Sequence, residues 1–191
     1  MRVAVDHRKK ILKSAAHLFA RKPFHEVLMD HVAQKSRVVK GTLYRFYPTK
    51  DELFAAVARE HMQLLIDETA AAGTRGTNPV TRLHAMLLRF TELCQEHKNF
   101  FHVMQLHEFE LRARHLDEFK NLRNILRDNF TGMISLAQKS GDLHCPFPIE
   151  IAADMLLGMV RSLLRYTMPD AAPERVCGLA IQVFVQGLKR G

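Results

Sequence analysis

Residues 28–52 read LMDHVAQKSRVVKGTLYRFYPTKDE, and the rest of the chain is best interpreted outward from this stretch. A short helical segment leads to a break at residues 36–39, and the next segment, residues 40–47, is both basic and aromatic. Pro48 ends that segment, and Thr49 and Glu52 then have the spacing of a capping box that opens a new helix. Two short helices joined by a tight turn, the second rich in groups that bind phosphates and base edges, are typical of a helix-turn-helix DNA-binding domain.

The net charge of +8 comes from the first quarter of the chain. Residues 1–50 carry 12 lysines and arginines against three acidic residues, whereas residues 51–191 carry 16 against 17. Positive charge concentrated in this way is expected where a protein binds a polyanion. The alternative is a basic tail that only aids solubility, but these charges are interleaved with helical periodicity, which favours binding.

The remaining composition indicates a protein of the reducing cytoplasm. The three cysteines, Cys94, Cys145 and Cys177, are far apart and form no Cys-x-x-Cys pattern, which argues against a disulfide framework and against a zinc site. The N-terminus lacks the apolar core of a signal peptide. The most apolar later stretch, residues 149–168, holds four charged residues, too many for a membrane span. We therefore expect a cytoplasmic location and no membrane partner.

Apolar residues recur with helical periodicity along the whole chain, and no segment alternates with period two for long enough to predict a sheet. We expect an all-α fold of about nine helices. A three-helix DNA-binding domain should cover residues 1–50, with a thin core that leans on helix four. Helix four, from Lys50, should link it to a larger ligand-binding and dimerisation domain over residues 51–191. Asp6 is the expected N-cap of the first helix, and a polar break is expected near residues 112–115. The expected helices cover residues 6–22, 28–35, 40–47, 50–71, 80–97, 100–111, 116–140, 149–166 and 174–188.

The last two expected helices are apolar on more than one face, so each must be covered on two sides. One side can face the domain core and the other a second subunit. A helix-turn-helix protein that binds DNA with two-fold symmetry also requires a second subunit. The alternative is one deep core without a dimer. The candidate interface residues are Met155, Met159, Leu163, Ile181, Phe184 and Val185.

The run KGTLYRFY at residues 40–47, followed by TKDEL at residues 49–53, closely resembles the signature of the tetracycline-repressor (TetR) family. The motif part of the resemblance covers about residues 8–60, and the rest of the chain is similar only in architecture. The resemblance implies a homodimer that binds a palindromic operator and is released when a small molecule enters the C-terminal domain.

Carried over from the family, the DNA contacts fall on seven residues. Those expected at or near phosphates are Lys40, the Gly41 backbone, Thr42, Tyr44, Tyr47 and Lys50. Thr42 and Arg45 are expected to reach base edges, where an arginine fork can hold a guanine. Arg37 adds a further cation facing DNA. Tyr44 could instead be a core aromatic whose hydroxyl alone touches DNA.

Three residues depart from the family pattern. Arg37 stands where the family usually has glycine in the turn, and a left-handed backbone there would cost roughly 1 kcal/mol. Leu28 stands where a serine or threonine commonly caps the second helix and touches a phosphate. Phe46 and Tyr47 reverse the commoner Tyr-Phe order, which can shift one phenol between the core and a phosphate.

The middle helices contain more phenylalanine and methionine than a minimal core requires, which is compatible with an adaptable apolar cavity. The alternative for each residue is ordinary core. Candidate pocket residues are Met86, Phe90, Phe101, Met104, Phe109, Arg123, Phe130 and Met133, and other candidate polar anchors are His102, Gln105, His107 and Arg127. If one of these arginines faces the cavity, an acidic or acyl-carrying ligand is favoured. If none does, a neutral apolar ligand is favoured.

The sequence offers little support for catalysis or metal binding. His97, His102 and His107 are five residues apart, which is the wrong spacing for one helix face, so we expect no metal and no cofactor. There is no nucleophile–base pair, glycine-rich phosphate loop or useful pair of carboxylates, so no catalytic residues are assigned. The rival interpretations are a helical enzyme or carrier with an incidental basic N-terminus, and a non-specific architectural DNA-binding protein. The protein could be a repressor or an activator, because both classes of regulator use the same DNA-binding motif.

Overall fold

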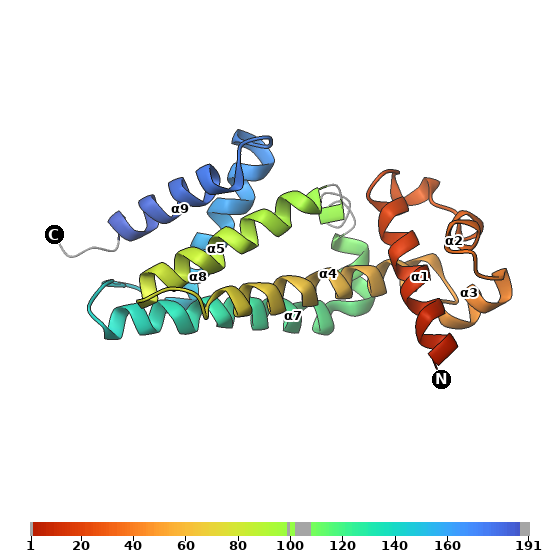
Figure 1. The fold of residues 1–191 in the computed structure, drawn as a ribbon, viewed down its shortest axis with the longest axis horizontal. Coiled ribbons are helices and arrows are strands. Elements are labelled where there is room, and N and C mark those ends of the chain that lie inside the picture. The colour runs from red at the N-terminus through yellow and green to blue at the C-terminus, as the bar shows by residue number, and fades with distance from the viewer. Residues whose placement is uncertain (1, 99, 102–107, 188–191) are drawn as a thin grey trace. The chain divides into compact units, whose positions relative to one another are not determined.

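The computed structural model describes residues 2–98, 100–101 and 108–187, and it is helical throughout (Figure 1). Its α-helices are α1 (Arg2–Phe19), α2 (Met29–Ser36), α3 (Lys40–Phe46), α4 (Lys50–Ala72), α5 (Pro79–Glu96), α7 (Glu108–Lys139), α8 (Ile149–Ser162) and α9 (Pro173–Gly187). A 3-10 turn, η1 (Phe24–Glu26), precedes α2, and a π-helical turn, η2 (Leu163–Thr167), extends α8. The described residues contain no strand, so the prediction of an all-α fold is confirmed.

Two helix starts differ from those expected. Helix α1 begins before Asp6, which is therefore not an N-cap; its carboxylate accepts a hydrogen bond from Lys10 Nζ at 2.6 Å. Helix α7 begins at Glu108 and continues through residues 112–115, so the break expected there is wrong. Polarity alone does not end a helix, and the arginine and alanine residues of this segment are good helix formers.

Side-chain caps open both α4, where the sequence predicts one, and α5. Thr49 Oγ1 accepts a hydrogen bond from the Glu52 N–H at 3.2 Å, as in a capping box. Asn78 Oδ1 accepts one from the Thr81 N–H at 2.9 Å, with Pro79 as the first residue of α5. Proline is favoured in that position because its missing N–H has no partner within the helix anyway.

The chain divides into two compact units. The first unit comprises residues 1–62 and 97–119, and the second comprises residues 63–96 and 120–191. Helices α4 and α7 each contribute residues to both units. The domain boundary at residue 50 stays a prediction.

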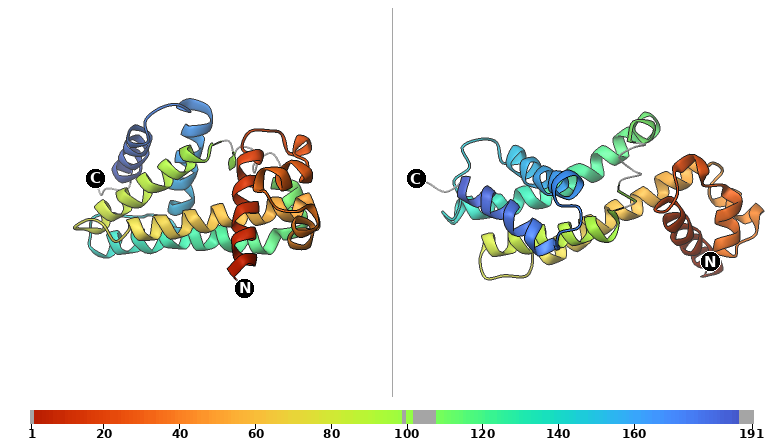
Figure 2. Two further views of the ribbon diagram at one scale, coloured as in Figure 1. Left: turned by 45° about the vertical axis from the view of Figure 1, so that its right-hand side comes forward. Right: turned by 90° about the horizontal axis from the view of Figure 1, so that it is seen from above.

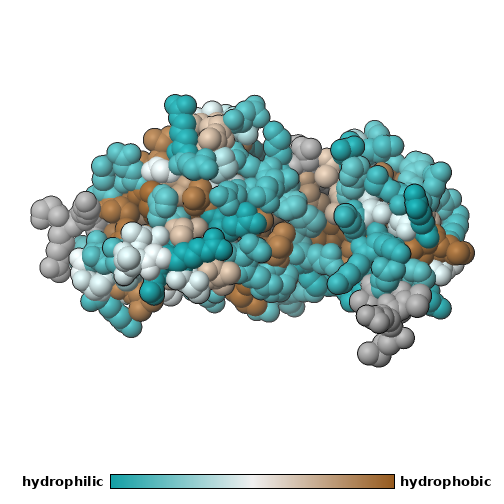
Figure 3. Space-filling model, in the orientation of Figure 1, coloured by the Kyte–Doolittle hydropathy of each residue, from teal (hydrophilic) through white to brown (hydrophobic). Residues whose placement is uncertain are grey.

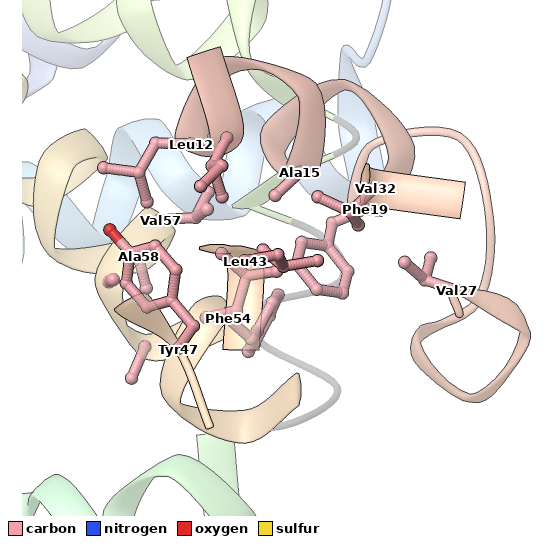
Figure 4. Close-up of a cluster of buried hydrophobic side chains, with 14 of the residues drawn as sticks. Leu12, Ala15, Phe19, Val27, Val32, Leu43, Tyr47, Phe54, Val57 and Ala58 are labelled. Carbon is pink, nitrogen blue, oxygen red and sulfur yellow. The ribbon is translucent and has the colours of Figure 1, made fainter. Parts of the chain in front are cut away.

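Helix α4 lies at the centre of the core of the first unit. Six consecutive residues, Leu53–Ala58, are buried. The Phe54 ring makes edge contacts with Phe19 and Phe24, with centroids 4.9 and 5.2 Å apart. Figure 4 shows Phe54 among the side chains of this cluster, next to Leu43 of α3. The short helices before α4 thus pack on it, because a small domain buries too little apolar surface by itself.

Residues from beyond α5 complete this core. Phe100 is 1% exposed and lies 5.9 Å from Phe54 between ring centroids, and the His61 ring stacks on Phe100 at 4.0 Å. Burial lowers the pKa of His61. The Arg59 guanidinium forms a two-pronged ion pair with Glu118, in which Nη2 lies 2.9 Å from Oε2. Helix α4 is therefore held within the first unit by α1–α3 and also by Phe100 and Glu118.

The second unit is built around α5, which contacts both α8 and α9. Figures 1 and 2 show α5 beside α9 in each view. Gln95 Nε2 donates a hydrogen bond to Ala171 O at 2.6 Å, which holds the end of α5 to the loop before α9. The buried residues of α5 are Leu83, Met86, Leu87, Phe90, Thr91 and Leu93. Within the described part of the chain, no helix has the length and apolar character needed to cross a membrane.

Candidate nucleic-acid interface

The turn between α2 and α3 contains a residue with a left-handed backbone. Arg37 has φ 56° and ψ 37°, and no other described non-glycine residue has a positive φ. The Arg37 N–H donates to Gln34 O at 3.2 Å, and the Val38 N–H donates to Ala33 O at 3.1 Å, which together close α2. A side chain in this conformation costs about 1 kcal/mol. The strain expected from an arginine in a glycine position is therefore present.

The four residues of the turn alternate between core and surface. Ser36 and Val38 are buried, and Ser36 Oγ donates to Ala33 O at 3.1 Å. Arg37 and Val39 face outward, and Val39 has 77% of its surface exposed. The turn is thus anchored on one side and exposed to solvent on the other.

Leu43 sets the orientation of α3, because its side chain is fully buried in the core. The exposed face of α3 carries most of the predicted DNA contacts. The exposed residues of that face are Lys40, Gly41, Tyr44 and Arg45, and Thr42 is half-buried beside them. Tyr44 is 39% exposed, so its ring is a surface aromatic rather than a core one. With Arg37 in the adjoining turn, three cations lie on or next to this face.

Lys40 already has an acidic partner in the free protein. Its ammonium lies 2.8 Å from Asp30 Oδ1 of α2, and this hydrogen-bonded carboxylate raises the pKa of Lys40. Both side chains are 60% exposed, so the pair contributes little stability. Sequence reasoning missed this pairing because the two residues are ten positions apart on different helices.

Tyr47 and Lys50 both have partners within the protein, and their phosphate contacts stay a prediction. The Tyr47 ring is buried, and its hydroxyl accepts a long hydrogen bond of 3.4 Å from Arg8 Nε. Lys50 Nζ donates to Phe24 O at 2.8 Å and lies 4.4 Å from the centroid of the Phe24 ring. The burial of Tyr47 follows from the reversed order of Phe46 and Tyr47. Tyr47 takes the second position of the pair, which is buried, and Phe46 takes the first, which is half-buried. A phosphate contact by either side chain would require it to leave these partners.

Both helices of the motif begin without a side-chain cap. Leu28 is the N-cap of α2 and Val39 is the N-cap of α3, and neither residue can accept a hydrogen bond from the first turn. Leu28 is 53% exposed. Figure 3 shows a mostly hydrophilic surface over α1–α3, with hydrophobic residues in small, separate areas. Sequence reasoning identified Leu28 as a residue that cannot cap its helix, but it did not identify Val39. Val38 and Val39 are the same residue type, and a four-residue turn is too short for periodicity to show which of the two is exposed.

The predicted effector-pocket residues fall into several environments. Met86, Phe90 and Phe130 are buried in the second unit, where the Phe90 and Phe130 rings meet edge-on at 6.2 Å. Arg123 and Met133 are half-buried in the same unit, whereas Phe101 is half-buried in the first unit. Met104, His102, Gln105 and His107, and the side chain of Phe109, lie outside the described residues.

The residues predicted for a subunit interface divide between surface and core. Met155 is 51% exposed, Met159, Leu163 and Val185 are half-buried, and Ile181 and Phe184 are buried. The apolar side chains that α8 and α9 do expose are Ile151, Met155, Leu179 and Val183, at 49%, 51%, 41% and 60%. Sequence reasoning missed three of these, because a helix that is apolar on several faces does not reveal which one its own core covers.

No group of three or more histidine, cysteine or acidic side chains in the described residues is arranged to hold a metal ion. The His97 ring meets His61 edge-on, with centroids 4.9 Å apart. Of the three histidines considered for a metal, only His97 is among the described residues.

Comparison with known proteins places both parts of the chain in one family. A family model described as bacterial regulatory proteins of the tetR family matches residues 11–57. A second model, described as the tetracyclin repressor-like C-terminal domain, matches residues 76–186. Together the two models cover most of the chain.

Individual relatives are distant. The transcriptional repressor KstR of Rhodococcus jostii is 32% identical over 91 residues, which cover 47% of this chain and 42% of KstR. The fatty acid metabolism regulator protein of Bacillus subtilis is 20% identical over 185 residues, or 94% of each chain. The crystal structure of a tetR-family regulatory protein from Rhodococcus RHA1 has a TM-score of 0.81 at 20% identity and covers 97% of this chain and 98% of that one. The chain thus spans less than half the length of the curated relatives that it matches over short segments.

Replacing Gly41 with alanine should separate stability from DNA binding. A Cβ at Gly41 would meet no atom within 4 Å, so packing does not require glycine there. Alanine should raise the free energy of unfolding by roughly 0.5–1 kcal/mol in urea denaturation. The same methyl group should weaken binding to duplex DNA in a fluorescence-anisotropy titration, because it stands where the backbone would approach phosphates.

The matched control for this variant is Gly132→Ala. Gly132 is also an exposed helical glycine with no atom within 4 Å of a Cβ, but it lies on α7 in the second unit. It should gain similar stability and bind DNA like the wild type. Wild-type DNA binding by Gly41→Ala would show that α3 does not approach DNA at this residue.

Arg37 allows backbone strain and charge to be measured apart. Arg37→Gly should raise the free energy of unfolding by up to about 1 kcal/mol, because glycine adopts φ 56° without a steric cost. Arg37→Ala keeps the strain and should show no such gain. Both variants lose one cation, so both should reduce the slope of log affinity against log salt by about one. Equal stability of the two variants would mean that the turn stores no strain.

Proposed function

The chain belongs to the TetR family of bacterial transcriptional regulators, and on this basis we propose that it is a repressor that binds a palindromic operator as a homodimer and is released by a small effector. The observation that carries the proposal is the exposed face of α3, on which cations surround a glycine that packing does not need. The KstR relative is named a repressor, which favours repression over activation.

Sequence-specific reading is favoured over non-specific architectural binding by the groups on this face. The Arg45 side chain is exposed, and its guanidinium lies 5.9 Å from the Phe46 ring centroid, which restricts the directions it takes. An arginine fork of this kind can donate two hydrogen bonds to one guanine, which discriminates by about 1–3 kcal/mol against other bases. Half-buried Thr42 offers a hydroxyl beside it.

The DNA-binding proposal is tested by selecting preferred duplexes from a random pool with the full chain. We expect a palindrome bound by at least two chains, with affinity that falls steeply as salt rises. Arg45→Ala should reduce the preference between bases at one position of each half-site by about tenfold. Lys35→Ala, which removes an exposed cation of α2, should leave base preference unchanged. A wild-type protein that enriches no sequence would contradict the proposal.

The proposed dimer interface is the exposed apolar face of α8 and α9. Ile151 and Met155 are one turn apart on α8, and Leu179 and Val183 are one turn apart on α9. The two helices contact each other, so the four side chains can form one face with two-fold symmetry to its copy. This replaces the predicted set, in which Ile181 and Phe184 instead pack in the core. A monomer with these side chains in water is the alternative.

Val183→Glu should convert the protein to a monomer, because it would bury an unpaired carboxylate in the interface. Sedimentation velocity at micromolar concentration should show the change, and operator affinity should fall at least tenfold. Leu136→Glu is the control, since Leu136 is 47% exposed on α7, outside the proposed face, and this variant should stay dimeric. A dimer that persists in Val183→Glu would place the interface elsewhere.

The proposed effector is an apolar or amphipathic molecule that binds within the second unit. Thr131 Oγ1 and Gln138 Oε1 are buried and have no hydrogen-bond partner among the described residues, so they are available to a polar group of a bound molecule. They are seven residues apart on α7, which places them on one side of that helix. The name of the Bacillus subtilis fatty acid metabolism regulator agrees with a ligand of this kind.

A further inference from the structure

Val39 is the most exposed large apolar side chain among the described residues, at 77%. It is the N-cap of α3, with φ −61° and ψ 137°. Its carbonyl accepts hydrogen bonds from the Thr42 and Leu43 N–H groups at 2.8 and 3.1 Å, so the helix itself fixes the direction of the side chain. The preceding residue, Val38, is 7% exposed. Two identical neighbours therefore have opposite roles, one in the core and one on the surface.

The fold gains nothing from valine at residue 39. Serine, threonine, asparagine or aspartate in an N-cap accepts a hydrogen bond from the first turn, whereas valine cannot. A single exposed apolar residue needs no special explanation by itself. Val39, however, lies between Arg37 and Lys40, in the surface proposed to contact DNA. An apolar side chain there would lose its contact with water whenever that surface is covered.

The major groove has only one apolar group that such a side chain can meet. The N-terminal residues of a recognition helix lie closest to the base edges. Those edges carry hydrogen-bond donors and acceptors, except for the C5-methyl group of thymine. Opposite any other edge, valine would leave polar atoms of the base without water or a partner, which is unfavourable.

We propose that Val39 recognises the C5-methyl group of a thymine and so specifies an A·T pair in each half-site of the operator. This inference rests on the proposed function, in which α3 enters the major groove. Leu28 is also an exposed apolar N-cap, at 53%, but it opens the first helix of the motif. That helix crosses the DNA backbone, where there is no methyl group, so Leu28 provides a control.

The test replaces single thymines of the selected operator with deoxyuridine, which removes only the methyl group and keeps base pairing. At one thymine per half-site, the wild type should lose about fourfold in affinity for each half-site, the value for one buried methyl group. Val39→Ser should bind the thymine and deoxyuridine duplexes equally, and its serine also caps α3, so the variant should fold. Leu28→Ser should keep the wild-type dependence on the methyl group.

Each outcome decides the proposal. A wild type that is indifferent to every deoxyuridine replacement in a selected operator would overturn the role of Val39 and leave operator binding intact. A methyl dependence that persists unchanged in Val39→Ser would assign the contact to another residue. If selection enriches no sequence, the proposed function fails, and this inference fails with it.

Discussion

The two helices proposed to contact DNA depend on burial against α4. Helices α2 and α3 have 8 and 7 residues, and helices this short are not stable in water by themselves. Leu43 of α3 and Val32 of α2 are fully buried in the cluster to which α4 contributes Leu53–Ala58. Because that core fixes the inner face of α3, it also fixes which residues face outward. The chemistry of the exposed face is therefore a consequence of packing on the opposite one.

Several residues in and around the helix-turn-helix motif are not the residue types that would make the fold most stable. Leu28 and Val39 leave two helices uncapped, Arg37 holds a left-handed backbone, and Gly41 occupies a helical position that packing leaves free. Each of these choices costs the fold on the order of 1 kcal/mol. All four lie within residues 28–41, and local rules are commonly broken where function requires a particular residue. Their clustering supports an interface here independently of the positive charge.

Most helix positions were predictable, because they follow from local rules. Thr49 caps the helix expected of it, and the left-handed backbone at Arg37 follows from its place in the turn. The placement of Tyr47 and Lys50 was not predictable, because it depends on partners such as Arg8 and Phe24, which are distant in the sequence. Which side chains of α8 and α9 face outward was not predictable for a similar reason. Periodicity reveals an apolar face only when the other faces are polar.

The proposed release of DNA has to act through helices that contribute to both units, of which α4 is one. Within the first unit, α4 contacts Glu118 and Phe100 through interactions of unequal strength. Arg59 and Glu118 are 40% and 39% exposed, and a pair so accessible to water contributes at most about 1 kcal/mol. Phe100 is 1% exposed, and burying a phenylalanine contributes about 1.5–3 kcal/mol. The position of α4 beside α1–α3 therefore depends more on the apolar contact of Phe100 than on the ion pair. The proposed effector, to act through α4, would have to overcome that apolar contact.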